Sequence, residues 1–196
     1  MPVIGRLHYN APVILTYTFL AFVATWFVAI DPNSAARVFA VYNSPLSPLF
    51  VVRLFTHVLG HINIEHFTGN FMLILLIGPM LEEKYGSRTI LAMIVITAFV
   101  TGFINVLLFD TALMGASGVA FSFIIISSLV NLREGKIPLT FVLVVVLYIG
   151  REIYASVAIT YTNISHITHI IGGVCGAVIG LYLARSKPRV SSGIKS

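Results

Sequence analysis

Six apolar segments, most of them long enough to cross a lipid bilayer, limit most strongly what this chain can fold into. They occupy residues 11–30, 66–81, 90–109, 115–132, 137–149 and 166–184. A spanning helix needs about 20 mostly apolar residues, and only helices or closed barrels satisfy their backbone groups in hydrocarbon. The pattern predicts an all-α membrane protein whose six transmembrane helices form a compact bundle.

Composition supports this class and excludes others. Of the 196 residues, 58% are hydrophobic and only 10% are charged, against about 25% charged in a typical soluble domain. The net charge of +5 does not indicate a nucleic-acid partner, because the basic residues are scattered and form no stripe or patch. The single cysteine, Cys175, excludes an internal disulfide framework and a cysteine-based metal motif, and we interpret it as structural.

The first connection, from Asp31 to Glu65, is long and semi-apolar. Pro32, Pro45 and Pro48 prevent one continuous helix there. Its second half, residues 49–59, is too apolar for a freely solvated loop, so we expect short helices that lie in the membrane interface. The preceding run, residues 11–30, exceeds the usual apolar length of a signal peptide and predicts a retained first span.

The distribution of Lys and Arg residues along the chain predicts the orientation of the spans in the membrane. Nine of the 12 Lys and Arg residues fall at the two termini or in the second and fourth connections: Arg6, Lys84, Arg88, Arg133, Lys136, Arg185, Lys187, Arg189 and Lys195. Because cytoplasmic segments carry the excess of basic residues, both termini are predicted to be cytoplasmic. We expect one membrane domain over residues 1–184, a basic cytoplasmic tail over 185–196, and a multi-pass location in the cell membrane.

Polar residues inside these apolar segments are candidates for function, since each costs free energy in hydrocarbon. They form three sets: Ser117 at the start of the fourth span, His66 and Asn70 on one face at the start of the second, and His166 and His169 at the start of the sixth. These three spans run in the same direction, so the sets are predicted to lie at similar depth.

A hydroxyl, an imidazole and polar donors at one depth are what an acyl-transfer site needs. His169 is followed on its own helical face by Gly172 and Gly176, which would let the sixth span pack closely against the fourth beside Gly118. Alternatively, the small residues around Ser117 serve helix packing alone, and His169 is a buried histidine bonded to a carbonyl. Only the joint pattern favours catalysis.

The motifs themselves resemble those of the rhomboid family of intramembrane serine proteases. The segment 53–70, with His66 and Asn70 as His-x-x-x-Asn, is similar to the family's entry into its second span, and residues 82–87 to its cytoplasmic turn. Residues 115–118 match Gly-x-Ser-Gly, and residues 169–172 match the His-x-x-Gly of the sixth span. The resemblance covers most of the chain and is closest to the minimal six-span form of bacteria or archaea.

The resemblance implies a role for each matching residue. Ser117 would be the nucleophile and His169 the general base, with no acidic third member. His66, Asn70 and the backbone N–H of Ser117 would form the oxyanion hole, and the remaining residues would support the site: Gly115, Gly118, Phe121 and Gly172. The family needs no metal or cofactor, and it cleaves single-pass membrane proteins, its partners in the lipid, near the outward end of their helix.

Two positions depart from the family's usual pattern. Val52 stands before Arg53 where many members have tryptophan, and Phe121 stands where many have a tyrosine that packs on the catalytic imidazole. We expect activity to survive both changes. We also expect a polar pocket, lined by His66, Asn70 and His57 or His61, to admit water from the outside.

Three other functions compete with a serine protease. A metalloprotease is disfavoured, because residues 61–66 come close to His-x-x-Glu-His but contain one residue too many. A metal transporter could use His57, His61 and His66 as ligands, although no repeat or broken helix supports it. A catalytically inactive rhomboid-like protein would bind membrane proteins without cutting them, and the presence of the matching site residues disfavours this alternative.

Overall fold

Helices make up most of the part of the chain that the structure describes. The computed structural model describes residues 9–129, 139, 142–143, 146–147 and 163–185, and side chains in the last helix from His169 to Leu183. The named helices are α1 (Pro12–Ile30), α2 (Pro32–Phe39), α3 (Pro48–Thr56), α4 (Ile64–Tyr85), α5 (Ser87–Leu108), α6 (Ser117–Leu129) and α8 (Asn163–Arg185). The all-α prediction is confirmed for these residues.

Three of these helices, α1, α4 and α5, are long and apolar enough to cross a membrane, and α6 and residues 169–183 of α8 are shorter apolar helices. They correspond to five of the six predicted spans. The fifth predicted span, residues 137–149, lies largely outside the described residues. The protein is therefore a multi-pass helical membrane protein, and the number six stays a prediction.

Local capping chemistry determines where the helices of the first connection begin. Asp31 accepts a hydrogen bond from the Ser34 amide at 3.1 Å, and Ser47 accepts one from the Phe50 amide at 3.1 Å. A proline follows each cap in the first turn, where its missing N–H costs nothing. The connection therefore contains short helices, as predicted: α3 lies in its apolar second half, and α2 precedes it in the first half. Their prolines start helices as well as preventing a continuous one.

The ends of α4 differ from the predicted ends by a few residues. The side chain of Asn63 accepts a hydrogen bond from the His66 amide at 2.8 Å, so the helix begins at Ile64 instead of His66. At the other end, residues 82–85, predicted as a turn, form the last helical turn. The chain reverses at Gly86, whose φ of +83° favours glycine.

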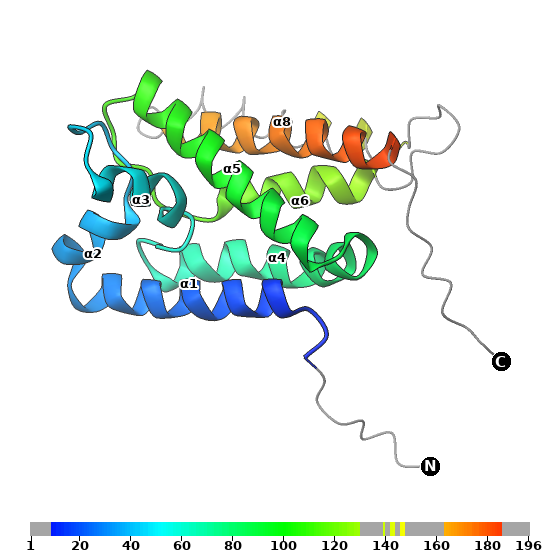
Figure 1. Ribbon diagram of the computed structural model, residues 1–196, viewed down its shortest axis with the longest axis horizontal. Coiled ribbons are helices and arrows are strands. Elements are labelled where there is room, and N and C mark those ends of the chain that lie inside the picture. Colours follow the sequence, from blue (N-terminus) through cyan, green and yellow to red (C-terminus); the bar gives the residue numbers. More distant parts are fainter. Residues whose placement is uncertain (1–8, 130–138, 140–141, 144–145, 148–162, 186–196) are drawn as a thin grey trace, which may run out of the picture.

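The helices α4, α6 and α8 run in the same direction, as predicted, and α1 and α5 run the opposite way (Figure 1). The starts of α4, α6 and α8 therefore gather at one end of the bundle, near α2 and α3, on the left in Figure 1. Helix α6 contacts α4, α5 and α8. It is buried on several sides through residues such as Val119, Ala120 and Ile125, so it is the central helix among those described.

A glycine and a carboxylate of α4 hold α1 against this helix. A Cβ atom added at Gly78 would lie 2.6 Å from Cδ1 of Ile14, so the missing side chain makes room for α1. The Glu82 carboxylate accepts hydrogen bonds from the amides of Val13 and Ile14, both at 3.0 Å, and from the Ser87 hydroxyl at 2.7 Å. Glu82 thereby caps α1, whose first amides have no partner within the helix, and ties it to the junction of α4 and α5.

Candidate active site

Ser117 is the first residue of α6 and is buried, with 8% of its surface exposed. Gly115 precedes it with a φ of +139°, a conformation that residues with a side chain rarely adopt. A Cβ atom at Gly115 would also lie 2.7 Å from Cε1 of His66. Glycine is therefore required at position 115 for two reasons: the backbone conformation and the close contact with the His66 imidazole of α4.

Two histidines before α4 hold the main chain that leads into Ser117. The Ala116 amide donates a hydrogen bond to Nε2 of His61 at 3.1 Å, and the Gly115 amide donates one to the His57 carbonyl at 2.9 Å. Because Nε2 of His61 is an acceptor, the proton of the neutral ring lies on Nδ1, which donates to the Leu59 carbonyl at 3.2 Å. Both ring nitrogens of His61 are thus engaged by main-chain atoms.

The first connection braces the same segment from the other side. Val41 and Leu113 form a short antiparallel bridge through two backbone hydrogen bonds of 3.0 and 2.8 Å. Arg53 is buried, donates to the Ser44 hydroxyl at 2.7 Å and lies over the Tyr42 ring, 4.2 Å from its centroid. The chain before Ser117 is therefore held by partners far away in sequence.

His66 and Asn70 project from one face of α4, as their spacing predicted. The His66 ring packs edge-on against His61, with ring centroids 5.0 Å apart. Asn70 is buried, and within the described part of the chain its Nδ2 has no hydrogen-bond partner. A buried amide donor without an acceptor costs about 1–3 kcal/mol, so this N–H group is available for a ligand oxygen.

Helices α6 and α8 approach closely enough for their backbones to touch. A Cβ atom at Gly172 would lie 2.3 Å from the Gly118 carbonyl oxygen, and one at Gly176 would lie 2.5 Å from that of Ser122. The two contacts are four residues apart on both helices, so α6 and α8 pack side by side in parallel. The predicted role of Gly118, Gly172 and Gly176 in tight packing is confirmed.

This packing places the His169 ring against Phe121 of α6, with ring centroids 4.6 Å apart and an interplanar angle of 45°. Phe121 lies four residues after Ser117, on the same face of α6. Phenylalanine therefore keeps the ring contact expected at this position, without a hydroxyl. Val52, the other departure, is exposed on α3.

Burial shifts the titration of both loop histidines. Burial lowers the pKa of His57 to about 4, and the hydrogen bond to the Ala98 carbonyl, 2.9 Å from Nε2, only partly opposes the shift. Burial, followed by repulsion from His66, lowers the pKa of His61 to about 4. Both rings are therefore neutral at physiological pH. A neutral His61 ring agrees with the hydrogen bond that its Nε2 accepts from the Ala116 amide.

The structure thus brings most of the predicted site residues to one end of the bundle, but it corrects one expectation. His57 and His61 do not line an open polar pocket, because they are 1% and 0% exposed and bind main-chain atoms. The role of His61 beside Ala116 was missed, and its only sequence signal is its place in a segment rich in histidine. For His166, the other histidine at the start of the sixth span, the structure describes the helix and not the side chain.

The same contacts bear on the metal-transporter alternative. In the described part of the chain, no group of three or more His, Cys, Asp or Glu side chains is placed to hold a metal ion. His57, His61 and His66 lie near one another in sequence, but the first two are bound to the main chain.

Apolar helices around a buried serine, imidazoles and an amide donor define the class: a multi-pass membrane protein with polar groups gathered at one end of its bundle. The model of the Rhomboid domain matches residues 49–186. The chain therefore belongs to the rhomboid family, whose members are mostly intramembrane serine proteases. The comparison with curated proteins gives no match.

Proposed function

We propose that this protein is an intramembrane serine endopeptidase that hydrolyses a peptide bond near the outer end of a single-pass transmembrane substrate. Membership of the rhomboid family supports the reaction class. The proposal includes six spans with both termini in the cytoplasm, which follows from the excess of basic residues on one side.

One observation carries the proposal: the contact between the backbones of Gly118 and Gly172. It sets α8 directly against the first turn of α6. His169 lies on α8 one turn before Gly172, and its ring packs against Phe121, which shares a face of α6 with Ser117. A histidine that served packing alone would not need two glycine contacts between backbones to bring its helix this close.

In the proposed reaction, Ser117 Oγ attacks the carbonyl carbon of the scissile bond while His169 takes the hydroxyl proton. The tetrahedral intermediate collapses when His169 returns this proton to the leaving amine, which breaks the C–N bond and leaves an acyl ester on Ser117. Water then attacks the ester with His169 again as the base, which releases the carboxylate and restores the serine hydroxyl.

The negative charge on the intermediate would be stabilised by three donors. The backbone N–H of Ser117, as one of the first amides of α6, has no acceptor within its helix. Asn70 offers its unpartnered Nδ2, and the His66 ring lies against Gly115, two residues before the nucleophile. Removal of one such donor typically lowers kcat by about 10²–10³-fold.

The substrate must partly unwind before this chemistry can occur, because a transmembrane helix buries its peptide groups in intrahelical hydrogen bonds. Residues that weaken the helix near the site are expected to favour cleavage. By resemblance to the rhomboid family, a small residue is expected immediately before the scissile bond.

Labelling of the purified protein with a fluorophosphonate, which reacts with activated serines, tests the proposal. We expect one label on Ser117, its loss in Ser117→Ala and His169→Ala, and no cleavage of a model transmembrane substrate by either variant. Ser127→Ala is the matched control, because Ser127 lies on the same helix ten residues further on, and it should label and cleave normally.

Two results would contradict the proposal. Cleavage that persists in Ser117→Ala and stops on addition of a chelator would indicate a metalloprotease. Binding of the model substrate by the parent protein without labelling or turnover would identify the inactive binder.

A further inference from the structure

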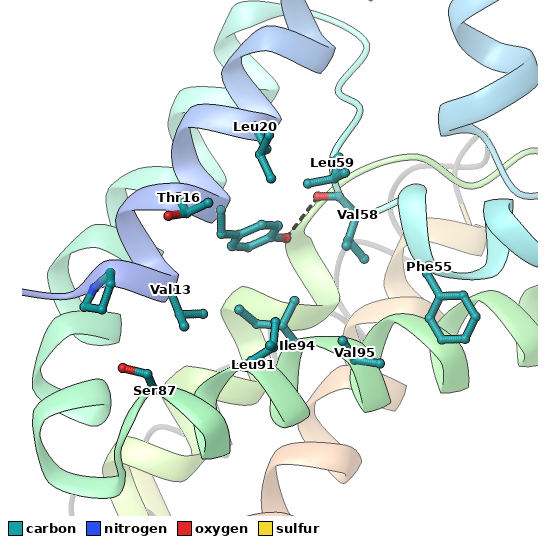
Figure 2. A pocket seen from close by; sticks show the side chains of 12 residues that line it. Val13, Thr16, Leu20, Phe55, Val58, Leu59, Ser87, Leu91, Ile94 and Val95 are labelled. Carbon is teal, nitrogen blue, oxygen red and sulfur yellow. Dashed lines mark hydrogen bonds between the residues drawn. The ribbon is translucent and has the colours of Figure 1, made fainter.

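An apolar cleft lies between α1 and α5, and the segment that connects α3 to α4 closes one end of it through Val58 and Leu59. Its volume is about 520 Å³, and Figure 2 shows its walls: Val13 and Leu20 from α1, Leu91 and Val95 from α5, and Phe55 at the end of α3. The side chains of Leu20, Phe55, Leu91 and Val95 are between 38% and 52% exposed. The cleft therefore opens sideways, on the outer surface of the bundle.

The surroundings of this surface determine what fills the cleft. Both α1 and α5 are long and apolar enough to cross the membrane, so their exposed side chains face hydrocarbon. The lining from Ser87 to Val95 spans about 12 Å at 1.5 Å per residue. Water along the apolar walls would lack polar partners, and an empty cleft would lose dispersion contacts. A hydrocarbon chain in the cleft would restore the dispersion contacts with its apolar walls.

The cleft has polar lining residues, and a basic residue follows one of them in the chain. Thr16 and Ser87 line it, and Arg88 is exposed beside Ser87. Arg88 lies three and seven residues before Leu91 and Val95, so the three share one face of α5. Carboxylates also lie nearby: Glu82 is buried and accepts three hydrogen bonds, whereas Glu83 is exposed on α4.

We propose that this cleft binds one acyl chain of an anionic phospholipid, whose phosphate pairs with Arg88. The order of groups along α5, a cation followed by an apolar wall, matches the order of groups in the lipid. The proposal does not depend on proteolytic activity, because the cleft contains none of the proposed catalytic or oxyanion-hole residues.

Photochemical labelling in a bilayer tests this binding site. The full chain is reconstituted in phosphatidylcholine vesicles that contain a small fraction of phosphatidylglycerol with a photoreactive acyl chain. After irradiation, the labelled peptides are identified by mass spectrometry. We expect label to concentrate on residues 13–20 and 87–95, relative to the exposed face of α4 formed by Met72, Leu76 and Met80.

A matched pair of variants separates the cleft from the general lipid surface. Leu91→Trp fills the cleft and should lower labelling of residues 13–20 about tenfold, whereas Leu76→Trp adds the same side chain to α4 outside it and should leave this labelling unchanged. Equal labelling in the two variants would overturn the proposal. Even labelling of all lipid-facing helices would also overturn it. So would cross-links from the cleft residues to a second copy of the chain, or to residues 1–8, in place of the lipid.

Competition in the parent protein tests the headgroup separately. Unlabelled phosphatidylglycerol should displace the probe from the cleft at concentrations at which added phosphatidylcholine does not, and Arg88→Gln should abolish this difference. Equal competition by the two lipids in the parent protein, or a difference that persists in Arg88→Gln, would overturn the assignment of the phosphate to Arg88.

Discussion

At the scale of single residues, one hydrogen bond from the Ala116 amide to His61 sets the main chain immediately before Ser117. The acceptor is an imidazole whose other nitrogen is already occupied by the Leu59 carbonyl. The ring therefore cannot turn away without breaking both contacts. This coupling of Ala116 to the segment before α4 makes His61 a positioning residue for the proposed oxyanion hole.

His61→Leu is expected to lower kcat at least tenfold with little change in KM, because the buried Ala116 amide loses its acceptor and the Ser117 N–H moves from its place. His61→Gln keeps an acceptor oxygen at similar reach and should recover part of the loss. Steady-state kinetics on a model transmembrane substrate measure both. Equal kcat in the two variants would show that the acceptor is irrelevant.

Gly172→Ala should lower both the melting temperature in detergent and the rate of cleavage. Its Cβ would collide with the Gly118 backbone, and backbone, unlike a flexible side chain, cannot turn aside; overpacking of this kind costs about 1–3 kcal/mol. Gly69→Ala is the control, since its Cβ would meet nothing within 4 Å and alanine favours the helix. A parent-like melting temperature for Gly172→Ala would contradict the tight contact between α6 and α8.

At the scale of helices, Glu82 connects three elements that are adjacent in space. Its two carboxylate oxygens receive the first amides of α1 and the hydroxyl of Ser87 at the start of α5, from a position in the last turn of α4. Because the carboxylate is buried and has only donors around it, it forms charge-assisted hydrogen bonds, which are stronger than neutral ones. The contact determines where α1 begins relative to the α4–α5 hairpin.

Glu82→Gln is expected to destabilise the protein by about 1–3 kcal/mol, since the new NH₂ group faces a backbone donor and cannot replace the lost acceptor. Glu83→Gln, an adjacent exposed position, is the control and should change stability little. Denaturant titration in mixed micelles compares the two. Equal stability of both variants would mean that the Glu82 contacts contribute nothing measurable.

At the scale of the whole molecule, the buried loop histidines make stability depend on pH. The folded-state pKa of His57 and of His61 is about 4, below the unfolded value of about 6.5. The unfolded chain therefore binds more protons between these values. Stability is highest above pH 6.5 and falls as the pH drops towards 4.

Each histidine is expected to contribute at most about 3 kcal/mol to this loss. Melting temperatures measured from pH 7 to pH 4.5 should decline in the parent protein, and the decline should be roughly halved in His61→Gln, which removes one of the two titrating groups. A melting temperature that does not change with pH would contradict the neutral, buried state of both rings.

The positions of the helices could be predicted well from the sequence, and their exact ends less well. The predicted start of α4 is two residues too late because Asn63 caps the helix before Ile64, and residues 82–85, predicted as a turn, form its last helical turn. Both errors arise where a polar side chain at a helix end accepts hydrogen bonds from backbone amides. Asn63 accepts one from a free amide at the start of α4, and Glu82, in the last turn of α4, accepts two from the first amides of α1.

The sequence by itself determined that the chain is a helical membrane protein and which polar residues lie at the starts of its second, fourth and sixth apolar segments. Length, hydrophobicity and spacing suffice for this, because they act within one segment. Only the tertiary structure decided that Gly176 meets the Ser122 backbone, that His61 binds Ala116, and that a cleft opens between α1 and α5. These features join residues distant in sequence, and they depend on how whole helices pack against one another.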